Sequence, residues 1–204
     1  GQGDLHHRHV KFGGNVADNA GANTDLNDLT VNAATLLVGA GVIMVENDLN
    51  LGGTNNVVVD ENGVYTSNNG NITFNANGNL DAADGTEALQ LVTTLVGDVV
   101  LGTIGNAVPL VNFDVDAAGI GIINSNITVA GAIDFAGSAN VDLSGDSSIT
   151  STADGAVTFG TDVDGPFALQ ITNQSGAVTV GSVGANDRLD SLSLTSQTST
   201  VTVN

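Results

Sequence analysis

GAVTFGTDVDGPFALQITNQSGAVTVGSVGANDRLDSLSLTS, residues 155–196, is the stretch of sequence that decides the fold. It contains the pattern G-x-(V/I)-x-(F/L/V) twice, as GAVTF at 155–159 and GAVTV at 176–180, which begin 21 residues apart. The same pattern occurs as GNITF at 70–74 and GDVVL at 97–101, which begin 27 residues apart. A motif that returns at such intervals indicates a repeat protein in which each interval is one structural unit.

A longer repeat of roughly 80 to 90 residues contains this short one. Three segments fit the pattern x-L-x-x-(L/F)-x-(V/L)-x, and two pairs of longer segments align without a gap. The three segments are DLNDLTVN (25–32), PLVNFDVD (109–116) and RLDSLSLT (188–195), and the pairs are 43–59 with 127–143 and 84–91 with 164–171. The chain is therefore expected to be a repeat array rather than one irregular domain.

These alignments divide the chain into two parts. Residues 1–9 form an irregular N-terminal segment, because GQGDLHHRH departs from the repeat. Residues 10–204 form an array of about two and a quarter repeats, namely 10–98, 99–177 and the partial copy 178–204.

The segments between the glycines are typical of short β-strands. In FDV, IDF and LSL an outer pair of apolar residues flanks Asp or Ser, and Gly, Asn or Asp bounds each segment. This is the pattern of strands and turns, whereas the i, i+3, i+4 spacing of a helix is not sustained anywhere. The sequence therefore predicts an all-β fold.

Two all-β architectures fit this pattern. In a parallel β-solenoid, each coil of roughly 20 residues supplies two or three strands that stack about 4.8 Å from those of the next coil. In tandem Ig-like β-sandwiches, each unit of roughly 85 residues forms one domain. Aromatic residues make up only 3% of the chain and Trp is absent. Because Ig-like cores are usually built on bulky aromatic side chains, we expect the solenoid and keep the sandwich as the alternative.

The repeats resemble those of large bacterial surface proteins of the filamentous-haemagglutinin and β-strand-repeat adhesin type. The resemblance lies in GNITF, GAVTFGTDVDGPFALQI and GAVTVGSVGANDRLDSLSLTS, and it extends from about Val10 to the end of the chain. It implies a right-handed β-solenoid shaft that is secreted across a Gram-negative-type envelope. Such a shaft projects from the cell surface or forms an extracellular filament or biofilm matrix fibre.

The charge balance excludes several classes of partner. The formal net charge is −19, with 22 Asp and Glu against only three cations, Arg8, Lys11 and Arg188. Double-stranded nucleic acid and anionic membrane surfaces both require cations, so neither is an expected partner. The longest apolar run, 36–45, contains glycines and is too short to span a bilayer, so membrane insertion is not expected either.

Asp114 and Asp116 are the strongest candidates for catalysis. They lie two residues apart in FDVD, so they share one face of a strand while Phe113 and Val115 occupy the other. Two nearby carboxylates can serve a glycoside hydrolase. The other copies carry Thr30 with Asn32 and Ser193 with Thr195 at these positions, which favours solvent-facing strand residues over a catalytic pair. We therefore expect no catalytic residue and no enzymatic activity.

Asp162 and Asp164 in TDVDG resemble the start of a calcium loop, but the Glu of an EF-hand is missing. Because Asp84-Gly85 aligns with Asp164-Gly165, turn formation is the simpler explanation. Weak, opportunistic Ca²⁺ binding is compatible with the charge, but no defined metal site and no other cofactor is expected.

Three further patterns are candidates for a metal site, phosphate-binding loops and an ice-binding face. His6, His7 and His9 could hold a transition metal, but terminal fraying favours no site there. Recurring glycines are expected to form coil turns and not phosphate loops. They are Gly97, Gly102 and Gly105 in one copy and Gly176, Gly181 and Gly184 in the next. Thr-rich TSTVTV suggests ice binding, which we discount because no T-x-T column recurs from coil to coil.

These observations together predict a non-enzymatic structural or adhesive protein. Its expected partners are itself, by end-to-end stacking or within a longer chain, and host or matrix glycans. The alternative is a carbohydrate-active or glycan-binding β-helix protein. That alternative requires carboxylates clustered with His, Lys or aromatic side chains, and Tyr65 is the only Tyr.

Overall fold

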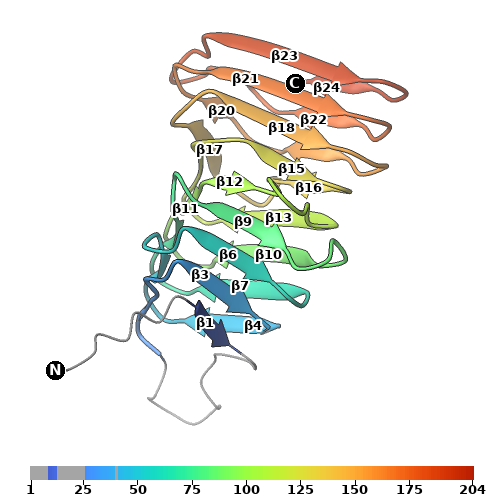
Figure 1. Ribbon diagram of the computed structural model, residues 1–204. Helices are drawn as coiled ribbons and strands as arrows, with labels where there is room; N and C mark the ends of the chain where they lie inside the picture. The colour runs from blue at the N-terminus through green and yellow to red at the C-terminus, as the bar shows by residue number, and fades with distance from the viewer. Residues whose placement is uncertain (1–8, 13–25, 40) are drawn as a thin grey trace, which may run out of the picture.

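The computed structural model describes residues 9–12, 26–39 and 41–204, and all regular structure in them is β. The strands form three parallel sheets stacked as a β-solenoid of about 8 turns, each of roughly 23 residues (Figure 1). The coil is slightly longer than the roughly 20 residues expected. Every pair of neighbouring strands in these residues is parallel, which excludes the Ig-like alternative because its sheets are antiparallel.

The three sheets contain nine, eight and seven strands within the described residues. Sheet A has the order β1 (His9–Phe12), β3 (Thr35–Val38), β6 (Asn56–Val59), β9 (Asn79–Ala82), β12 (Thr103–Ile104), β15 (Ile127–Val129), β18 (Ser147–Ser151), β21 (Ala168–Asn173) and β23 (Ser191–Ser196). Sheet B has β4 (Val42–Val45), β7 (Gly63–Ser67), β10 (Ala88–Thr93), β13 (Asn112–Ala117), β16 (Ile133–Asp134), β19 (Val157–Phe159), β22 (Val178–Val180) and β24 (Val201–Val203). Sheet C has β2 (Leu29–Thr30), β5 (Leu49–Leu51), β8 (Ile72–Phe74), β11 (Val99–Leu101), β14 (Ile120–Ile123), β17 (Asn140–Leu143) and β20 (Val163–Asp164).

The short motif of the sequence marks consecutive coils. GNITF and GDVVL contain β8 and β11, which pair in sheet C, and GAVTF and GAVTV contain β19 and β22, which pair in sheet B. In β19 and β22, Val157 lies opposite Val178 and Phe159 opposite Val180. The 21- and 27-residue intervals are therefore each one turn of the solenoid.

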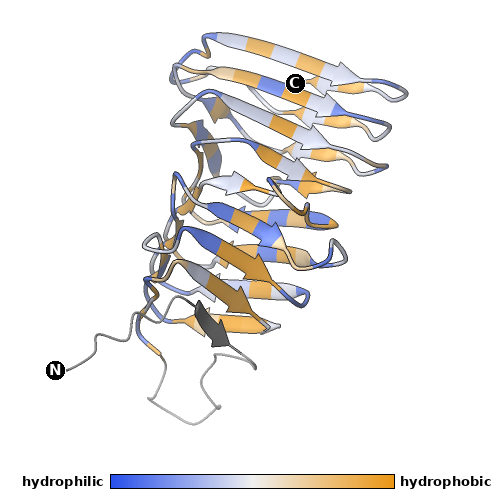
Figure 2. Cartoon of the chain, viewed as in Figure 1, coloured by the Kyte–Doolittle hydropathy of each residue, from blue (hydrophilic) through white to orange (hydrophobic). Residues whose placement is uncertain are grey.

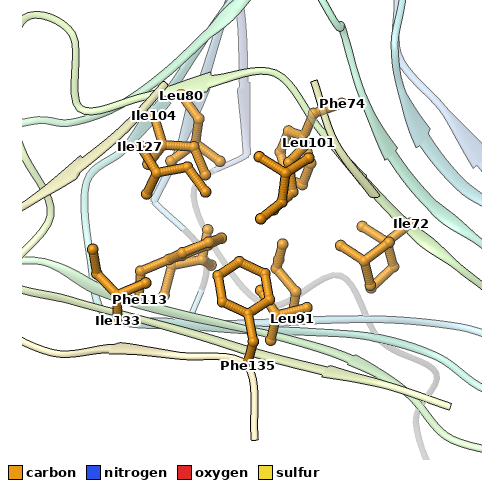
Figure 3. Packing of buried hydrophobic residues seen from close by; sticks show 14 of the residues in the cluster. Ile72, Phe74, Leu80, Leu91, Leu101, Ile104, Phe113, Ile127, Ile133 and Phe135 are labelled. Atoms are coloured by element: carbon orange, nitrogen blue, oxygen red, sulfur yellow. The ribbon is translucent and has the colours of Figure 1, made fainter. Parts of the chain in front are cut away.

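The strands alternate inward apolar and outward polar residues, as the period of a β-strand requires. In β19, for example, Val157 and Phe159 are buried while Thr158 between them is partly exposed. Figure 2 shows the result as orange and pale or blue bands that alternate along the strands. The inward residues of all three sheets meet in one continuous core (Figure 3).

Three phenylalanines stack within this core. The rings of Phe135 and Phe159 are parallel with centroids 5.1 Å apart, and those of Phe113 and Phe135 meet edge to face at 6.3 Å. The composition predicts a core of Val, Ile, Leu and Ala, and most of the other buried residues are of these types, although Tyr65, Phe74 and several Ser, Thr and Asn side chains are buried as well. The aromatic column was not foreseen, because its rings come from different coils and meet only through the strand register.

Glycine is required where consecutive coils turn from sheet A to sheet B. A Cβ on Gly176 would lie 1.9 Å from the carbonyl oxygen of Gly155, and one on Gly155 would lie 1.9 Å from the carbonyl carbon of Gly131. Inward polar side chains hydrogen-bond the carbonyl groups of these turns in the preceding coil. Ser151 donates to the carbonyl of Gly131 at 2.7 Å, and Asn173 donates to that of Gly155 at 2.8 Å. The motif glycines thus serve coil turns, as the sequence predicts.

The long repeat does not correspond to a whole number of turns. Residues aligned 84 positions apart, such as 43–59 and 127–143, are separated by about three and two-thirds coils of roughly 23 residues. Aligned segments therefore lie on different sheets. The three segments 25–32, 109–116 and 188–195 contribute β2 to sheet C, β13 to sheet B and β23 to sheet A.

Candidate functional site

Asp114 and Asp116 project from β13 on the outer side of sheet B. Phe113 and Val115 are buried and the two carboxylates are partly exposed, as the FDVD alternation predicts. The Nε2 of Gln90, on the neighbouring strand β10, donates to Oδ2 of Asp114 and to Oδ2 of Asp116, both at 2.9 Å. One amide thus bridges both carboxylates from the preceding coil.

A third carboxylate joins this pair from the following coil. Asp134 in β16 lies directly opposite Asp114 in the parallel register, as Gln90 does on the other side. Burial, followed by the negative charges of Asp116 and Asp134, raises the pKa of Asp114 to about 6. Like charges at opposed positions of a sheet destabilise it, so the cluster carries a cost at neutral pH.

The sequence alone identifies the Asp114–Asp116 pair but not Gln90 or Asp134. Their positions depend on coil lengths of 24 residues before Asp114 and 20 after it. No motif in the sequence gives these lengths. The offset of the long repeat explains why Thr30 with Asn32 and Ser193 with Thr195 lie elsewhere. They belong to sheets C and A and cannot face the cluster.

Asp164 belongs to a second group of acidic residues, on sheet C. It is only 2% exposed, and its Oδ1 accepts the backbone N–H of Asn186 at 3.0 Å while its Oδ2 accepts Nδ2 of Asn186 at 2.9 Å. Burial alone raises its pKa, but these hydrogen bonds outweigh burial and the pKa lies below the ordinary value. These hydrogen bonds reach the next coil, so Asp164 connects its own coil to the following one, while Gly165 after it has a φ of +119° that is typical of a turn.

Asp142 lies opposite Asp164 in the register of sheet C. Burial, then the charges of Asp164, Asp187 and Asp98, raise the pKa of Asp142. The aligned Asp84 instead forms a local turn, because its Oδ1 accepts the backbone N–H and the hydroxyl of Thr86, two residues further on. The pKa of Asp84 is lowered, first by the Thr86 hydroxyl, then by the Glu87 side chain and the Thr86 N–H, and Gly85 has a φ of +87°.

Side-chain oxygens of Asp and Asn connect each coil to the next. At the entrance to sheet C, Asp48 Oδ1 accepts the N–H of Asn71 at 2.8 Å, Asn71 Oδ1 accepts that of Asp98 at 2.7 Å, and Asp98 Oδ1 accepts that of Ile120 at 2.8 Å. Each of these donors is a backbone amide one coil further along the chain. We call this series the corner ladder, with Asp48, Asn71 and Asp98 as its rungs.

The same arrangement occurs at other corners. Asn62, Asn112, Asn126 and Asp146 accept the backbone N–H groups of Ala88, Ala132, Ser148 and Ala168, respectively, at 2.8 to 3.0 Å. No motif considered above predicts this role. The available signal is an Asp or Asn immediately before a short strand, as in Asp48-Leu49, Asn71-Ile72 and Asp98-Val99.

The remaining predicted candidates give no assembled site. His6 and His7 lie outside the described residues, and for His9 only the strand β1 is described. Within the part of the chain that the structure describes, no three His, Cys, Asp or Glu side chains are grouped so that they could hold a metal ion. No helix in that part is long and apolar enough to cross a membrane.

Comparison with models of protein families, with curated proteins and with solved structures finds no match for this chain. What the chain does is therefore argued from its own geometry.

Proposed function

We propose that the chain is a non-enzymatic structural element, a β-solenoid shaft segment or subunit of an extracellular, cell-surface filament or biofilm matrix fibre with an adhesive role. The single observation that carries this proposal is the use of its acidic and amide side chains. The side chains of the corner ladder, and Asp164 as well, accept backbone N–H groups of the next coil. Groups engaged in this way build a shaft coil by coil.

The edge formed by β23 and β24 favours elongation of the shaft in one direction. Leu192 and Val201 lie in register with the buried Leu169 and Val178, yet they are 36% and 40% exposed. One more coil stacked on this edge would bury them and pair the open strands. That coil would come from the same polypeptide or from a second copy that stacks end to end. The extracellular location rests on the resemblance to surface adhesins.

A pair of matched variants tests this growth. Val201→Lys places a charge on the core side of β24, whereas Thr202→Lys places it on the outer side of the same strand. Filament lengths measured by electron microscopy should fall for Val201→Lys and stay unchanged for Thr202→Lys. Equal lengths for the two variants would refute end-to-end stacking through this edge.

A carbohydrate-active protein is the second candidate, and Asp114 is the observation that favours it. A pKa near 6 is in the range that a general acid needs, and Asp116 and Asp134 are close to it. We assign these groups a structural role because Gln90 donates to both Asp114 and Asp116. Turnover of acidic or neutral polysaccharides that disappears in Asp114→Asn would overturn the structural proposal.

A further inference from the structure

The outer side of sheet A from β3 onward carries fewer charges than the rest of this acidic molecule, with the exposed Asp146 at its border beside Ser148 and with Lys11 of β1 in register with Leu37. We call it the neutral face and define it by two columns of outward residues that run along the solenoid. The first column is Thr35, Asn56, Asn79, Thr103, Asn126, Ser148, Gln170 and Ser193. The second is Leu37, Val58 and Asp81, followed after a gap by Thr128, Thr150, Thr172 and Thr195.

Asp81 is the single acidic residue in these two columns, and its charge is covered. Its side chain is 5% exposed, and Oδ1 accepts the backbone N–H groups of Ala107 at 2.9 Å and Val108 at 3.3 Å. Sheet B carries partly exposed carboxylates at opposed positions, Asp114 with Asp134, and sheet C carries partly exposed Asp142 opposite Asp164, which is itself covered. The net charge of −19 is thus distributed away from the neutral face.

Charge restricts how two such molecules can approach each other side by side. Contacts through sheets B or C oppose carboxylates to carboxylates, which repel over roughly 8 Å at physiological ionic strength. Contacts through the neutral face oppose hydroxyl and amide groups. Because Ser, Thr, Asn and Gln each donate and accept hydrogen bonds, such a face is complementary to an identical one.

The spacing of the columns also favours a second copy as the partner. Thr128, Thr150, Thr172 and Thr195 lie directly opposite one another in sheet A. Their strands β15, β18, β21 and β23 belong to four consecutive coils, which are stacked in Figure 1. Consecutive coils are about 4.8 Å apart in any parallel solenoid of this kind, so the same contact recurs at every coil when two copies align. Their side chains are partly or fully exposed and therefore accessible.

We propose that the neutral face binds the neutral face of a second copy of this chain, so that solenoids associate side by side. Eight coils about 4.8 Å apart and two columns wide give roughly 500 Å² per copy, below the 800 Å² or so of a stable interface. The contact between two 204-residue chains is therefore weak, and each added coil strengthens it. It goes beyond the proposed shaft role, because it requires nothing from the ends of the solenoid.

Disulfide trapping tests this proposal, because the chain contains no cysteine. Thr150→Cys places a thiol in the middle of the neutral face. The matched control Thr179→Cys places one on the outer side of sheet B, where Thr179 lies between Thr158 and Thr202 as Thr150 lies between Thr128 and Thr172. Both variants leave the ends of the solenoid unchanged, so failure of end-to-end stacking does not affect the comparison.

The readout is the rate of covalent dimer formation under oxidising conditions, divided by the rate at which each thiol reacts with a small disulfide reagent. This ratio removes differences in thiol reactivity near carboxylates. We expect the normalised rate to be about tenfold higher for Thr150→Cys, and to rise further with salt that screens the corner charges. Adding Thr172→Glu to Thr150→Cys should remove the difference. Equal normalised rates, or faster dimerisation from Thr179→Cys, would overturn the proposal.

Discussion

Asp114 makes the stability of the molecule depend on pH. Its pKa is about 6 in the folded chain and near 3.9 in an unfolded one, so the folded state holds the proton more tightly. The stabilisation that the folded state gains by holding this proton is therefore complete below about pH 4 and disappears as the pH rises through 6. Neutral-pH stability is reduced by the repulsion among Asp114, Asp116 and Asp134.

Asp114→Asn should relieve this repulsion. We expect the free energy of unfolding at pH 7 to rise by on the order of 1 kcal/mol, discounted for the partial exposure of the carboxyl, and its decline between pH 4 and 7 to flatten. Urea unfolding at several pH values measures both effects. Asp146→Asn is the control, because it keeps the side-chain oxygen that accepts the Ala168 N–H at an exposed corner. If the free energy of unfolding of Asp114→Asn depends on pH as that of the unchanged chain does, Asp114 is not the source of the pH dependence.

Two glycines provide a matched test of the coil turns. Gly176→Ala places a Cβ 1.9 Å from the Gly155 carbonyl oxygen, so the stacked turns must separate. We expect a loss of about 1 to 3 kcal/mol, the usual cost of overpacking. In Gly121→Ala the new Cβ meets nothing closer than 3.5 Å, and stability should hold or rise slightly. Thermal unfolding of the two variants decides whether close approach, rather than flexibility, explains these glycines.

At the scale of the strand and its turn, the corner ladder makes a separate prediction. Asn71→Ala removes the acceptor of the Asp98 N–H, and we expect a loss of about 1 kcal/mol, the typical net value of one hydrogen bond. Asn77→Ala, at an exposed turn position of the same coil, is the control. Hydrogen exchange should locate the effect at Asp98 and the start of β11. A uniform change along the chain would instead point to a general effect on the solenoid.

Single elements also show how far the sequence predicts this structure. The alternation in FDVD places Asp114 and Asp116 outside and Phe113 and Val115 inside, because strand periodicity alone decides it. The partners of Asp114 could not be predicted, since they depend on how many residues each turn uses. Between the paired strands of neighbouring coils, residues in register are from 20 positions apart, as Asp114 and Asp134 are, to 27 apart, as Ile72 and Val99 are.

The same variation in coil length explains why the long repeat does not predict the sheet to which each strand belongs. The gapless alignment of 43–59 with 127–143 correctly indicates that both segments form similar strands. Because the two segments are 84 residues apart, which is not a whole number of coils, the aligned strands lie on different sheets. The neutral face was missed for the same reason. We discounted Thr columns because no T-x-T pattern recurs, whereas the register builds a single-Thr column from four separate coils.

At the scale of the whole molecule, each coil of a solenoid contacts only the coils next to it, so local stability should vary along the axis. Strands in the middle, such as β13 and β16, have a coil on either side, whereas β23 and β24 have a described neighbour on one side only. We expect backbone amides of β13 and β16 to exchange most slowly and those of β23 and β24 to exchange fastest. Uniform protection along the chain would indicate all-or-none unfolding, contrary to this expectation.

As a structural shaft, a three-sided parallel β-solenoid must be a smooth rod whose coils repeat along its axis. Electron microscopy of the purified chain, with and without calcium, combined with helical image analysis tests this requirement most directly. We expect smooth, unbeaded rods or fibres with an axial repeat near 4.8 Å, the spacing between stacked strands. Beaded particles, or fibres that lack this repeat, would contradict this expectation.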